Sequence, residues 1–204
     1  MSLEERFIFD NDRDTKMTLR ALKSGTLVVR NLQKIVKLDT KELKADVTFL
    51  RTCLRMDAYD VSVICIGKHK MQNMNKMTRD KDNPTEILSF PYHEKAINGK
   101  LPHPTSPCDL NLGDIYLCVP LIRQKCFHRG ISLRVNILRF VAHGLCHLMG
   151  YDHSTEHKWK IMFRKEREIL NALSYVRGIE VQAAYDTKHY IPEFGTLWLV
   201  PRIK

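Results

Sequence analysis

Apolar residues recur every three or four positions in several segments of the chain, and this spacing predicts amphipathic helices that present one face to a core. The first helix begins at Asp39 or Thr40, either of which can cap it. Two longer helices are predicted over 132–149 and 155–173. In the first helix, the core-facing positions are Leu43, Val47, Leu50 and Leu54. In the helix over 132–149, they are Val135, Leu138, Ala142, Leu145 and Met149.

Short runs rich in β-branched and apolar residues lie between these helices and predict strands. The runs occupy residues 26–32, 60–67, 86–90 and 113–119. A further helix is expected around Met71, Met74 and Met77, with the three methionines filling the core. Because strands and helices interleave, we expect an α/β or α+β fold: a single compact domain with a small mixed sheet packed by helices.

The ends of the chain lack this patterning. We expect residues 1–25 to form a leader, 26–177 the folded domain and 178–204 a C-terminal extension. Residues 16–38 contain no acid, a composition shared with organelle presequences. No apolar run approaches the roughly 20 residues that cross a bilayer, so a membrane is not expected among the partners.

Charge favours a polyanionic partner. Lys and Arg number 33 against 23 Asp and Glu, giving a formal net charge of +10, which points to nucleic acid. The helix predicted over 155–173 mixes cations with aromatic residues, so its cations could meet phosphate, or it could be an ordinary solvated amphipathic face. Its cations and its large apolar residues are Lys158, Lys160, Arg164, Lys165, Arg167, Trp159, Met162 and Phe163.

Three histidines predict a metal site. His143 and His147 are spaced i, i+4 and share one helix face, while Gly150 can reverse the chain so that His153 supplies a third ligand. Three imidazoles with a vacant fourth position are typical of a catalytic metal ion.

The alternative is that the three histidines are placed by chance. Cys146 could compete as a ligand, but it points about 100° away from His147, so packing is its expected role.

The spacing matches the H-E-x-x-H-x-x-G-x-x-H signature of metzincin proteases, except that Gly144 replaces the general-base glutamate. Three neutral ligands leave the full charge of a divalent ion in the site, which favours an anionic substrate such as a phosphodiester. Arg79 could bind a phosphate or stabilise charge that develops on it, or could be a solvated loop residue.

Three motifs in order make the chain resemble the YbeY family of metal-dependent endoribonucleases. They are H-G-L-C-H-L-M-G-Y-D-H from His143 to His153, R-D-K-D-N-P-T-E-I-L-S-F-P from Arg79 to Pro91, and L-G-D at Leu112 to Asp114. The resemblance covers roughly residues 27–173 and is highly specific. The form of the histidine motif and the long loop before Leu112 resemble the animal branch, which implies a mitochondrial location if the source is an animal and the cytoplasm otherwise.

The resemblance implies one Zn²⁺ per chain on His143, His147 and His153, with Arg79 as the second functional residue. It implies action on small-subunit rRNA during ribosome assembly or quality control, with a small-subunit ribosomal protein or the subunit as partner and no small-molecule cofactor. We expect a water activated by zinc to act on an RNA phosphodiester, and Arg79, His143 and His147 to be the catalytic residues. Weaker candidates for substrate binding or for orienting a ligand are Lys81, Asp114 and Asp152.

Two other functions remain open on the sequence. The protein could be a non-catalytic ribosome-assembly factor whose metal is structural. It could also be a metzincin-like peptidase that takes its base from elsewhere, because Gly144 offers none.

Overall fold

The computed structural model describes residues 24–181, so the expected leader and most of the expected C-terminal extension lie outside the described residues. The elements in chain order are β1 Leu27–Asn31, α1 Thr40–Cys53, β2 Asp60–Ile66, α2 Lys68–Arg79, β3 Ile87–Pro91, the 3₁₀ turn η3 Pro107–Asp109, β4 Asn111–Cys118, α3 Val119–Arg129, α4 Leu133–Leu148 and α5 Glu156–Arg177. Of the helices in the described range, none is long and apolar enough to cross a membrane.

A four-stranded mixed sheet forms the centre of the molecule, in the order β1-β2-β4-β3. β1, β2 and β4 run parallel, with Val63 opposite Ile115 in the β2–β4 register. β3 is an edge strand that runs antiparallel to β4, and its Ser89 also lies opposite Ile115. The sheet is therefore mixed, as the sequence predicted.

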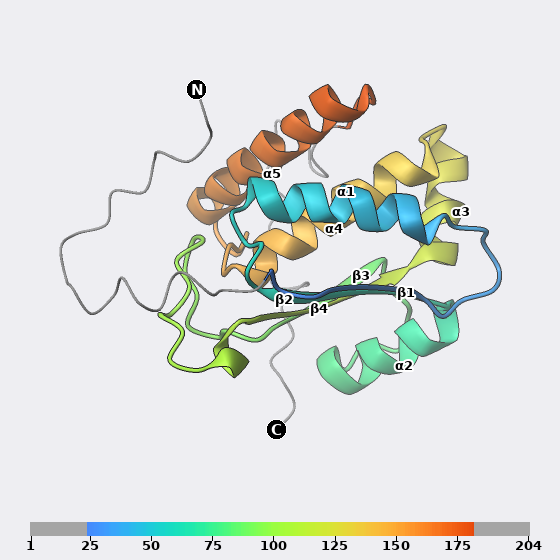
Figure 1. The fold of residues 1–204 in the computed structure, drawn as a ribbon. Helices are drawn as coiled ribbons and strands as arrows, with labels where there is room; N and C mark the ends of the chain where they lie inside the picture. Colours follow the sequence, from blue (N-terminus) through green and yellow to red (C-terminus); the bar gives the residue numbers. More distant parts are fainter. Residues whose placement is uncertain (1–23, 182–204) are drawn as a thin grey trace, which may run out of the picture.

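Helices cover both faces of this sheet (Figure 1). α1, α4 and α5 lie over one face, and α2 lies alone on the other. The strands alternate accordingly: Ile115 and Leu117 of β4 belong to the large core under α4, while Cys118 belongs to the small core under α2. The α/β architecture is confirmed, and α4 is placed directly on β3 and β4.

One helix was not predicted. α3 begins at Val119, where the sequence predicted the end of a strand, because Pro120 fits the first turn of a helix and its fixed φ favours that turn. The helix ends at Gly130, whose φ of 63° is left-handed. The strand–helix junction therefore occurs within two residues and leaves no loop to detect.

The methionines of α2 differ in their surroundings. Met71 is fully buried and Met74 packs against the small core, as expected. The expectation was wrong for Met77, which is 75% exposed. Met77 lies six residues after Met71, about 240° around the helix, so its side chain points away from the buried face of α2.

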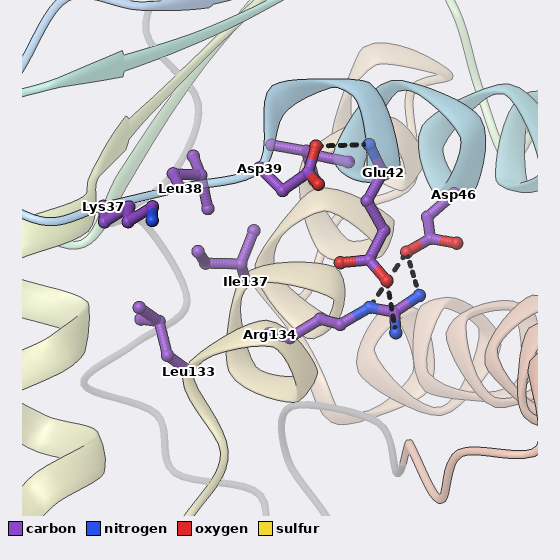
Figure 2. A pocket seen from close by; sticks show the side chains of 9 residues that line it. Lys37, Leu38, Asp39, Glu42, Asp46, Leu133, Arg134 and Ile137 are labelled. Carbon is purple, nitrogen blue, oxygen red and sulfur yellow. Dashed lines mark hydrogen bonds and ion pairs between the residues drawn. The ribbon is translucent and has the colours of Figure 1, made fainter.

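A buried carboxylate joins three helices on the other face. Asp46 of α1 is 1% exposed, and its two oxygens lie 2.8 Å from Arg134 Nη2 of α4 and 2.8 Å from Arg177 Nε of α5. Glu42, one turn earlier in α1, also pairs with Arg134 at 2.8 Å. Figure 2 shows Glu42 and Asp46 reaching toward Arg134 beside a pocket between the first turns of α1 and α4. These ion pairs fix α1 against the two helices that build the site described below.

We expect the substitution Asp46→Asn to lower the free energy of unfolding by about 2 kcal/mol, because it weakens charge-assisted hydrogen bonds at a buried position. Urea unfolding followed by circular dichroism measures this. The control is Asp82→Asn, which removes an exposed ion pair with Lys76 and should cost at most about 0.5 kcal/mol. Equal effects of the two substitutions would contradict the role of Asp46.

Candidate metal centre

The three histidines of the predicted site come together. His143 and His147 lie one turn apart on α4, and His153 lies in the turn that follows the helix. All three are buried, and one ring nitrogen from each lies within 4.8 Å of the others. The i, i+4 spacing and the turn therefore produce the convergence that the sequence predicted.

The turn depends on Gly150. Its φ is 76°, and the backbone nitrogens of Gly150 and Tyr151 donate to the carbonyls of His147 and Cys146, which is the Schellman arrangement that ends a helix. A Cβ at position 150 would lie 2.1 Å from the carbonyl oxygen of Ala96, so the close approach requires glycine as well. This confirms the reversal at Gly150 that was expected to deliver His153.

Hydrogen bonds fix the orientation of two rings. Nδ1 of His143 donates to Glu166 Oε1 at 2.7 Å, and Nδ1 of His147 donates to the carbonyl oxygen of Tyr151 at 3.0 Å. Both partners are acceptors, so the hydrogen of each ring sits on Nδ1 and the lone pair sits on Nε2. The two Nε2 atoms face each other at 3.0 Å. Two lone pairs at that distance repel each other unless a cation lies between them.

The environment keeps His147 and His153 neutral. Burial lowers the pKa of His147 well below its usual value, helped by the charges of His143 and His153 and opposed by the carbonyl of Tyr151. Burial, helped by the charge of His143, lowers the pKa of His153 to about 3. At neutral pH both rings therefore keep the lone pair that a metal ion needs.

These features fit a divalent transition metal. Zinc–nitrogen bonds of 2.0–2.1 Å in a tetrahedral site place neighbouring nitrogens about 3.3 Å apart, close to the 3.0 Å between the two Nε2 atoms. Three neutral nitrogen donors suit zinc and also copper, iron or nickel. A metal ion held here would take His143, His147 and His153 as ligands, with no charged ligand to offset its own charge.

Gly144 brings α4 close to the sheet. A Cβ at this position would lie 2.9 Å from Ile115 Cδ1, 3.0 Å from Ile87 Cδ1 and 3.1 Å from Ser89 Oγ. A side chain at position 144 would therefore point into the sheet, where the side chains of β3 and β4 would have to shift to admit it. The position that carries the general base in metzincins is structural in this protein.

Cys146 is fully buried in the large core. Burial raises the pKa of its thiol well above the usual value, so the thiol stays protonated. The side chain packs as expected.

Arg79 is the last residue of α2 and is half-buried. Burial lowers its pKa to about 10, which still leaves the guanidinium charged at neutral pH. That charge contributes to the low pKa of His147, which places it within electrostatic range of the histidine cluster. Lys81, two residues later, is exposed in the loop that leads to β3.

Asp114 and Asp152, the two aspartates proposed from the sequence, are not the residues that orient the rings of His143 and His147. Asp152 accepts from the backbone and the hydroxyl of Ser154 and from Lys158 Nζ, so it stabilises the turn itself. Asp114 is half-buried on β4, and strand alternation directs it to the face that α2 covers.

Sequence reasoning missed Glu166. Its side chain is 2% exposed, and it lies on the buried face of α5 with Met162, Ile169 and Leu170. A lone carboxylate in the apolar stripe of an amphipathic helix was the available signal, since such a group is rarely buried without a partner. Its partner is the ligand His143.

We expect Glu166→Gln to weaken metal binding by 10-fold or more, because a neutral amide orients His143 less strongly and lowers its basicity. Competition with a chromophoric chelator measures this affinity. Glu168→Gln is the matched control, since Glu168 is an exposed residue of the same helix whose partner is Lys165. A metal affinity unchanged in Glu166→Gln would contradict the assignment.

Comparison with known proteins agrees with this geometry. The family model described as Endoribonuclease YbeY matches residues 28–174. The chain is 37% identical to a human protein named Endoribonuclease YbeY over 158 residues, which is 77% of this chain and 93% of the human one. It is 37% identical to a Bacillus licheniformis protein of the same name over 122 residues, 60% of this chain and 77% of that one.

A solved structure was also found in the comparison. The solution structure of TM1509 from Thermotoga maritima has a TM-score of 0.48 and 18% identity, covering 78% of this chain and 99% of that one. The family model spans most of the chain and includes every residue of the histidine cluster. The chain belongs to the YbeY endoribonuclease family.

Proposed function

We propose that this protein is a metal-dependent endoribonuclease whose ion is held by His143, His147 and His153. The observation that carries the proposal is the pair of Nε2 atoms facing each other at 3.0 Å, with both Nδ1 atoms engaged elsewhere. Family membership supplies the RNA substrate, and the net charge of +10 suits a polyanion.

The ion, Arg79 and Glu166 have different roles in this reaction. A divalent ion, when bound, supplies a Lewis acid that polarises a phosphoryl oxygen and activates water. Arg79 binds the phosphate and stabilises the negative charge that develops on it. Glu166 keeps the lone pair of His143 directed toward the ion. The general base does not come from position 144, since Gly144 lies against the sheet.

The finer assignment is zinc as the ion and small-subunit rRNA as the substrate, with a ribosomal subunit or one of its proteins as partner. Three imidazole donors support zinc. The human relative supports the animal branch and thus a mitochondrial location.

We expect Arg79→Ala to slow cleavage of a structured RNA by about 100-fold or more while the protein still binds its metal, because one charge-stabilising donor is lost. His147→Ala should abolish both cleavage and tight metal binding. Gel analysis of RNA cleavage and metal analysis of the purified variants provide the readouts. Arg123→Ala, at an exposed position of α3, is the control. The mechanism is wrong if Arg79→Ala and His147→Ala both cleave like the wild type.

Metal removal separates this function from that of an assembly factor with a structural ion. The large core between the sheet and α1, α4 and α5 is built from apolar side chains that need no metal ion to pack, so we expect the metal-free protein to keep its helical circular dichroism. Its melting temperature should fall by about 10 °C and its cleavage activity should vanish, both returning with added Zn²⁺. Loss of helicity on metal removal would favour the structural role instead.

A further inference from the structure

Two aromatic rings stack along α5. The centroids of Trp159 and Phe163 lie 5.4 Å apart with an interplanar angle of 17°. Arg167, one turn further on, places its guanidinium carbon 5.9 Å from the centroid of Phe163. Phe163 packs against the large core, while Trp159 is a half-buried side chain one turn before Phe163. Trp159 therefore uses one ring face for Phe163.

Trp159 lies close in sequence to the metal centre. It is in the first turns of α5, which follows directly on the turn that carries His153, and helical side chains lean toward the N-terminus of their helix. Lys158, the neighbour of Trp159, fixes this junction, because its Nζ lies 2.8 Å from Asp152 Oδ2 and 3.3 Å from Ser154 Oγ. These contacts hold the start of α5, and with it the backbone of Trp159, against the turn that carries His153.

Cations flank the aromatic stack. Lys160, Arg164 and Arg167 follow at i, i+4 and i+7 and so share a stripe of α5 adjacent to the two rings. Lys160 is paired with Glu156. Within residues 24–181, no ion pair is found for Arg164 or Arg167. An aromatic face bordered by available guanidinium groups is the combination that binds single-stranded nucleic acid.

We propose that Trp159 is a stacking platform for one nucleobase of single-stranded RNA, close to the phosphate that the metal centre cleaves. The inference rests on the proposed function and adds a base-binding subsite to it. A base would lie on the free face of Trp159 and extend the stack to Phe163, while Arg164 and Arg167 contact the backbone phosphates. Stacking accepts any base, so this subsite holds the strand without reading its sequence.

Fluorescence can test the contact directly, because the chain has two tryptophans. In the full-length, metal-containing protein with Trp198→Phe, Trp159 is the single fluorophore. The probe is a 2′-O-methyl oligoadenylate of eight nucleotides, which lacks the free 2′-hydroxyl. We expect saturable quenching of Trp159 by this probe and none by an abasic oligomer of the same length and charge. Binding of the probe without quenching would overturn the proposal, as would equal quenching by the abasic oligomer.

Affinity provides the second readout, measured by fluorescence anisotropy of a labelled probe. Trp159→Leu, which keeps an apolar side chain against Phe163, should bind about tenfold more weakly, and Trp159→Phe should stay within about threefold of the wild type. The control Phe127→Leu removes an aromatic ring that is 86% exposed on α3 and should change nothing. Unchanged metal content and helicity would show that the variants are folded.

The outcomes separate the two proposals. If Trp159→Leu binds the probe like the wild type while His147→Ala abolishes RNA cleavage, the platform is wrong and the endoribonuclease function stands. A wild-type protein that neither binds the probe nor cleaves RNA would overturn both. Weaker binding in Trp159→Leu together with base-dependent quenching supports the platform.

Discussion

The site depends on two imidazole nitrogens that face each other at 3.0 Å. Their hydrogens are committed to Glu166 and to the carbonyl of Tyr151, so neither ring can turn its donor toward the other. The protein keeps this arrangement unfavourable in the absence of a cation by burying both rings. Affinity for a metal ion is thus built from interactions that α4, the following turn and α5 impose together.

The same elements explain why a protease-like spacing supports a different chemistry. α4 lies so close to β3 and β4 that a side chain at position 144 would meet Ile115, Ile87 and Ser89. The three histidines bring no negative charge, and the charged Arg79 stands at the end of α2, within electrostatic range of the cluster. A substrate with its own negative charge suits such a site, and the glutamate with which metzincins cleave peptides is missing at Gly144.

Local patterns in the sequence were enough to predict most of the fold and the clustering of the three histidines. The helices, the strands and the reversal at Gly150 follow from periodicity and from a glycine in a left-handed conformation. α3 was missed because Pro120 begins it directly after β4, without a loop. The place of Glu166 in the apolar stripe of α5 marks it as a buried carboxylate, but its partner His143 depends on how α5 packs on α4, which no local pattern reveals. Met77 is exposed because it lies about 240° around α2 from the buried Met71.

The contact between Glu166 and His143 spans 23 residues of sequence. During synthesis the ribosome delivers all three imidazoles before it delivers the carboxylate that orients the first of them. A nascent chain that extends beyond His153 but ends before Glu166 has the three imidazoles but lacks the carboxylate that keeps the hydrogen of His143 on Nδ1. Tight metal binding therefore belongs to the completed domain, and a chain that ends in α5 before Glu166 would hold the ion more weakly.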